Sequence, residues 1–138
     1  METRSPDSRM LVLACSALLA TIALHGADHL LQDRGIGALT TEVKIGGFVN
    51  VAIAALAFAL AWREHPRAPV VAAVVGAYIA VGVSAAHFAP HWSALSDPYS
   101  ELGLGFASWA AAGAEVVAAA IVAAVGVAVL RQRRVTTA

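Results

Sequence analysis

This chain of 138 residues has room for one domain, and its 13% of charged side chains is well below the roughly 25% of a soluble domain. Its formal net charge of zero and its lack of a basic aromatic patch argue against a nucleic-acid partner. The mean hydropathy of +0.74 comes mainly from four long, almost uncharged segments, so we expect the protein to reside in a lipid bilayer.

Those four segments predict an all-α fold, an integral membrane four-helix up-and-down bundle that fills residues 1–138 as one domain. Backbone amide and carbonyl groups find no water partners in lipid, so each spanning segment must be helical. Short connections make consecutive helices antiparallel. The expected spans cover, in chain order, about residues 10–31, 45–62, 68–88 and 102–130.

The basic side chains indicate how the bundle is oriented. Cytoplasmic loops concentrate Lys and Arg, and seven of the nine basic residues fall on the side that holds both termini. We therefore expect a multi-pass protein of the cell membrane with cytoplasmic N- and C-termini. Amphipathic aromatic rings prefer the interfaces of a bilayer, and four such residues fall near the ends of the predicted spans: Trp62, Trp92, Tyr99 and Trp109.

Four of the five histidines collect at the opposite, outer end of the predicted bundle. The first span ends with HGADHLLQ, in which spacings of three, four and seven put His25, Asp28, His29 and Gln32 on one helical face. His87 and His91 are four residues apart at the end of the third span, where Pro90 is expected to end or bend the helix. Only His65 belongs to the cytoplasmic side.

Histidines at this spacing can direct two imidazoles at one ion. Zinc takes three or four such ligands, and imidazole also suits copper and iron. Asp28 could be a ligand or the acceptor that fixes an imidazole tautomer. The alternatives are heme b, held by His87 with His29 or His25, and histidines that merely hydrogen-bond water or lipid at a helix end. The candidate metal ligands are His25, Asp28, His29, His87 and His91.

Glu115 interrupts the apolar fourth span, roughly 20 Å from either predicted end at 1.5 Å per residue. An ionised carboxylate at the bilayer centre costs about 2.5–3.5 kcal/mol, so this side chain should face the interior, protonated or with a partner. Asn50 and Tyr78 are the nearest polar candidates on other spans. Glu115 is thus a candidate proton or cation site, or a hydrogen-bonding link between helices.

The sequence leaves three functional hypotheses. The first is a small polytopic membrane protein with a His/Asp site that binds a transition metal or heme. The second is a proton-coupled transporter that uses Glu115, and the third is a non-enzymatic accessory subunit in a homo-oligomer or larger membrane complex. No nucleophile-elbow sequence singles out a serine, so catalytic residues are not assigned and enzymatic activity is left open.

Overall fold

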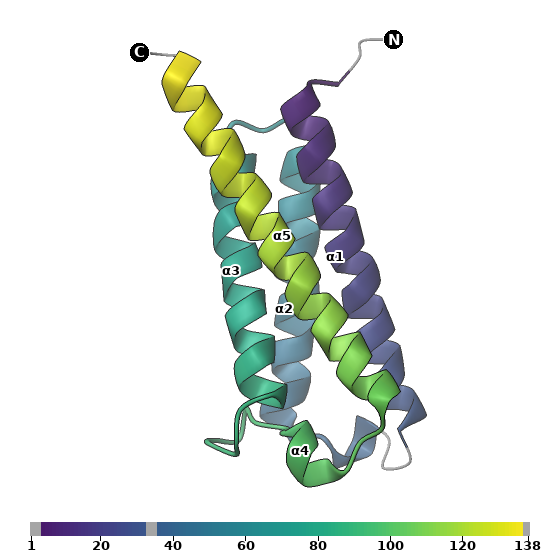
Figure 1. Cartoon of the computed structure of the whole chain (residues 1–138). Coiled ribbons are helices and arrows are strands. Elements are labelled where there is room, and N and C mark those ends of the chain that lie inside the picture. Colours follow the sequence, from purple (N-terminus) through teal and green to yellow (C-terminus); the bar gives the residue numbers. More distant parts are fainter. Residues whose placement is uncertain (1–3, 33–35, 137–138) are drawn as a thin grey trace.

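The computed structural model describes residues 4–32 and 36–136, and this part of the chain contains helices and loops but no strand. Four long helices lie side by side (Figure 1), and two short ones, η1 and α4, belong to the connections between them. The helices are α1 (Pro6–Leu31), η1 (Ile36–Ala38), α2 (Thr41–Trp62), α3 (Ala68–His87), α4 (Tyr99–Leu102) and α5 (Phe106–Thr136).

The prediction of four long apolar helices is confirmed, because α1, α2, α3 and α5 are each long and apolar enough to cross a membrane. The first two begin four residues earlier than expected, at Pro6 and Thr41. Polar caps explain the difference. The side chain of Ser5 accepts a hydrogen bond from the amide of Ser8, and Thr40 does the same for Val43, so each helix extends beyond its apolar segment.

The helix that corresponds to the fourth expected span begins four residues later than the expected start near residue 102. The short helix α4 ends at Leu102, and Gly103 follows in the left-handed region with φ of 63°. A new helix, α5, begins at Phe106 and continues beyond the apolar segment to Thr136. Glu115 therefore lies nine residues into α5, about 14 Å from its beginning, and not midway along the helix.

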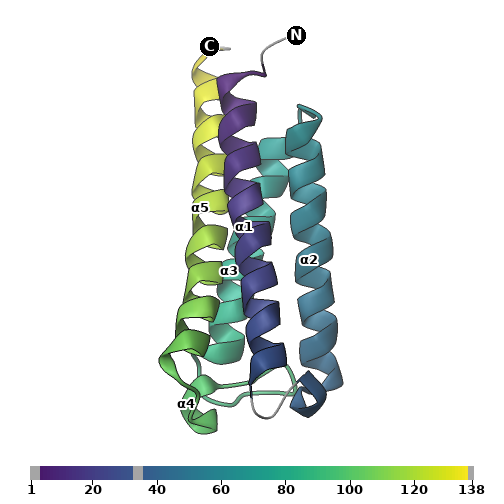
Figure 2. The same cartoon turned by 90° about the vertical axis from the view of Figure 1, so that its right-hand side faces the viewer.

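The helix α5 crosses between α3 and α1, whereas α2 packs on α1 and α3 from the other side (Figures 1 and 2). The contact between α3 and α5 is the most extensive in the bundle. Gly76 of α3 and Gly126 of α5 lie in this contact, where each helix meets the backbone of the other. Small residues thus allow α5 to approach α3 closely.

The two ends of the bundle differ. At the terminal end, where α1 begins and α5 ends, Arg4 places its guanidinium 4.1 Å from the centre of the Trp62 ring. At the opposite end, which we call the histidine end, residues 88–105 fold back against α3. The amide of Asp97 donates to the carbonyl of Ala86, and this fold buries Tyr99 completely. The connection between α3 and α5 therefore adds side chains to the interior.

Candidate metal centre

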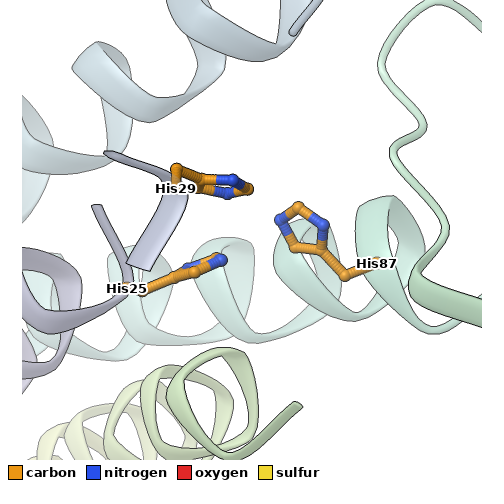
Figure 3. Close-up of side chains that lie close together, drawn as sticks. All are labelled: His25, His29 and His87. Atoms are coloured by element: carbon orange, nitrogen blue, oxygen red, sulfur yellow. The ribbon is translucent and has the colours of Figure 1, made fainter. Parts of the chain in front are cut away.

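Three buried histidines from two helices meet at the histidine end. His25 and His29 lie one turn apart on the inward face of α1, and His87 is the last residue of α3. Their exposed fractions are 6%, 8% and 5%. In Figure 3 the three rings face a common space, and one nitrogen of His87 is turned toward the two α1 rings. The imidazoles of non-adjacent helices thus converge, as the sequence hypothesis of a shared site requires.

The distances within this trio suit a metal ion. One ligand atom from each histidine lies within 4.8 Å of the other two, and the ring centres of His25 and His87 are 4.9 Å apart. An ion centred in a triangle with 4.8 Å sides is about 2.8 Å from each corner, whereas Zn–N bonds measure about 2.0–2.1 Å. Inward side-chain movements of roughly 0.7 Å would bring the three nitrogens to bonding distance of such an ion.

A backbone carbonyl orients His87. Its Nδ1 lies 3.1 Å from the carbonyl oxygen of Asp97, which is an acceptor only, so Nδ1–H donates to it. A neutral imidazole has one N–H, so Nε2 of His87 keeps a lone pair for a ligand. Residues 88–105 thus help to fix the tautomer of His87 as well as to close the histidine end of the bundle.

His25 has a partner at each ring nitrogen. Its Nδ1 lies 2.6 Å from Oε2 of Glu115, and its Nε2 lies 2.8 Å from the hydroxyl of Tyr99. The structure differs here from the sequence expectation, which offered Asn50 or Tyr78 as partner for Glu115; Tyr78 is 54% exposed. The carboxyl group therefore belongs to the histidine cluster, because α5 starts later than predicted and brings Glu115 level with His25.

The remaining predicted ligands, Asp28 and His91, are not members of the converging group. Within the described ranges, the group of converging ligand atoms consists of His25, His29 and His87. Both carboxylate oxygens of Asp28 accept hydrogen bonds, one from Ser108 and one from Gln32. Metal ligation by Asp28 stays a prediction without support from this arrangement.

His91 follows α3 in the connection to α4, where its side chain is exposed and its backbone amide donates to Oε1 of Glu101. Its role as a ligand also stays a prediction.

Tyr99 was expected at a membrane interface, yet it is buried with its ring centre 4.5 Å from that of His87. Tyr99 follows Pro98 in the connection between two predicted spans, and no helical periodicity there indicates that its side chain is buried.

Comparisons with protein-family models, with curated proteins and with solved structures find no match for this chain.

Proposed function

We propose that this protein is a multi-pass membrane protein that binds one transition-metal ion through His25, His29 and His87. The observation that carries the proposal is the convergence of these three buried imidazoles, with ligand atoms within 4.8 Å, inside an apolar helix bundle. Polar groups at such a position are costly and most often serve a function.

The donor set indicates the class of ion. Imidazole nitrogens favour zinc, copper and iron, whereas calcium and magnesium prefer oxygen ligands. Three protein ligands leave a further coordination position for water or another molecule, as in catalytic rather than structural zinc sites. We therefore favour a metal-handling or redox role over a purely structural one.

The packing of the rings favours a single ion over heme b. A bis-histidine heme inserts its porphyrin between two axial rings. Here the ring centre of His25 lies 4.8 Å from that of His29 and 4.9 Å from that of His87, so the third ring occupies space that the porphyrin would need. A metal ion fits between the rings with only small movements.

The transporter hypothesis gave Glu115 a separate role in the middle of the membrane. The carboxyl group instead hydrogen-bonds His25 and lies nearer the histidine end than the middle of α5. We therefore assign Glu115 to the same polar centre as the histidines.

Elemental analysis and an absorption spectrum of detergent-purified protein test the metal proposal. We expect about one metal ion per chain after supplementation with Zn²⁺, Cu²⁺ or Fe²⁺, and loss of that ion in His29→Ala and His87→Ala because each removes one of three ligands. His65→Ala is the matched control, since His65 lies at the terminal end near Arg67.

Wild-type protein without metal under all three conditions would overturn the proposal, and a Soret band would replace it with a heme site. The variant His91→Ala defines the extent of the site. Retained metal restricts the ligands to the three buried histidines, whereas lost metal would extend the site into the exposed connection.

We further propose that both termini face the cytoplasm and that the histidine end faces outward. The support is the predominance of Arg at the terminal end. Reporter fusions provide the measurement: green fluorescent protein at the C-terminus should fluoresce, and alkaline phosphatase inserted between α3 and α4 should be active. The reverse pattern of the two reporters would contradict this orientation.

A further inference from the structure

Glu115 offers a single carboxyl group to the metal centre from α5, a long helix that contributes no histidine to the trio. The side chain is 2% exposed, and its Oε2 lies 2.6 Å from Nδ1 of His25. An ionised carboxylate can only accept hydrogen bonds, so Nδ1 of His25 is the donor in this contact when Glu115 is ionised. The contact therefore selects one tautomer of His25.

The proton on Nδ1 of His25 determines the state of the second ring nitrogen, Nε2. A neutral imidazole with its proton on Nδ1 has a lone pair on Nε2. The hydroxyl of Tyr99, 2.8 Å from Nε2, donates to that lone pair in the metal-free site. The Tyr99 ring centre lies 4.5 Å from that of His87, so Nε2 is directed toward the side of the cluster where His87 stands.

We infer that Glu115 is a positioning residue of the metal centre, which holds His25 through Nδ1 so that Nε2 faces the ion. This inference rests on the proposed metal site. A carboxylate behind a ligating histidine fixes the orientation of the ring and increases its basicity. Tyr99 has the opposite effect, because its hydroxyl competes with the ion for the lone pair on Nε2 of His25.

Substitutions of Glu115 and Tyr99, the two partners of His25, should therefore change the Zn²⁺ affinity in opposite directions. Glu115→Leu removes the acceptor at Nδ1 and should weaken Zn²⁺ binding by about 10- to 100-fold. Glu115→Gln should weaken it less, since its amide oxygen can accept the same hydrogen bond. Tyr99→Phe removes the competing hydroxyl and should leave Zn²⁺ binding as tight as in the wild type or tighter.

The measurement is Zn²⁺ titration of the full-length protein in detergent against a competing chelator. Co²⁺ provides a spectroscopic readout, because its visible absorption reports ligand geometry. We expect the Co²⁺ spectrum to change in Glu115→Leu and to be preserved in Glu115→Gln. Thr21→Val is the control, because the hydroxyl of Thr21 on α1 donates to the backbone carbonyl of Leu18 and its loss should leave the Co²⁺ spectrum unchanged.

The outcomes separate this inference from the proposed function. Wild-type protein that binds neither Zn²⁺ nor Co²⁺, and that also carries no metal after supplementation with Cu²⁺ or Fe²⁺, overturns the metal site itself. Wild-type protein that binds Zn²⁺, with Glu115→Leu of equal affinity, overturns only the positioning role. Tighter binding in Glu115→Leu would show that Nδ1 is the ligand and would also overturn it. If Glu115→Leu does not fold, weaker binding in Tyr99→Phe overturns the inference by the same reasoning.

Discussion

Replacement of His25 by leucine is expected to lower the free energy of unfolding by about 3–5 kcal/mol, because the buried carboxyl group of Glu115 loses its imidazole partner. Glu115 is 2% exposed in a helix apolar enough to cross a membrane, so water does not readily replace the lost hydrogen bond. The measurement is unfolding of metal-free protein in detergent, followed by circular dichroism. Metal must be removed, since an ion that binds only the folded state would add its own stabilisation.

A double-mutant cycle tests whether the lost stability comes from the contact between His25 and Glu115. The double variant, His25→Leu with Glu115→Leu, removes the donor and the acceptor together, and a well-packed apolar pair is often as stable as the buried polar pair that it replaces. We therefore expect the double variant to recover most of the stability lost in His25→Leu. If His25→Leu costs as much in the Glu115→Leu background as in the wild type, the pairing is contradicted.

The convergence of the histidines could be predicted from the sequence because it depends on two simple regularities. The lengths of the apolar segments define the helices, and short connections bring the ends of alternate helices to one end of the bundle. His25 and His29 end the first span, and His87 ends the third. Helical periodicity also places His25 and His29 on one face, and this face is buried.

The role of Glu115 could not be predicted in the same way, since it depends on how far α5 is shifted along α1. Hydropathy does not resolve the break at Gly103, because the residues on both sides of it are apolar. The left-handed conformation of Gly103 separates α4 from α5, and this break moves the start of the long helix to Phe106. With α5 beginning at Phe106, Glu115 lies level with His25.

The placement of Tyr99 depends on hydrogen bonds between parts of the chain that no periodic pattern describes. The amide of Asp97 donates to Ala86, and the indole of Trp92 donates to Ala85, so the connection folds back on the end of α3. A pattern of apolar residues predicts which segments are buried in helices, but it does not predict how an irregular connection is folded.

The close contact of α3 and α5 predicts the second large effect. A Cβ atom added at Gly76 would lie 2.5 Å from the carbonyl oxygen of Ala119 and from the amide nitrogen of Ala123. These are backbone atoms, which cannot rotate away as a side chain can. We expect Gly76→Ala to cost about 1–3 kcal/mol of unfolding free energy, and Gly76→Val to cost more.

Gly126 should behave in the same way, because its added Cβ would lie 2.6 Å from the amide nitrogen of Ala73 and from the carbonyl oxygen of Pro69 on the facing helix. Gly82 is the matched control in α3, since a Cβ there meets nothing within 4 Å. Alanine is the better helix former, so Gly82→Ala should be neutral or slightly stabilising. Equal unfolding curves for the Gly76 and Gly82 variants would contradict the close packing. We also expect Gly76→Ala to weaken Zn²⁺ binding, because separation of α3 from α5 would move His87 away from Glu115 and from the His25 ring that contacts Glu115.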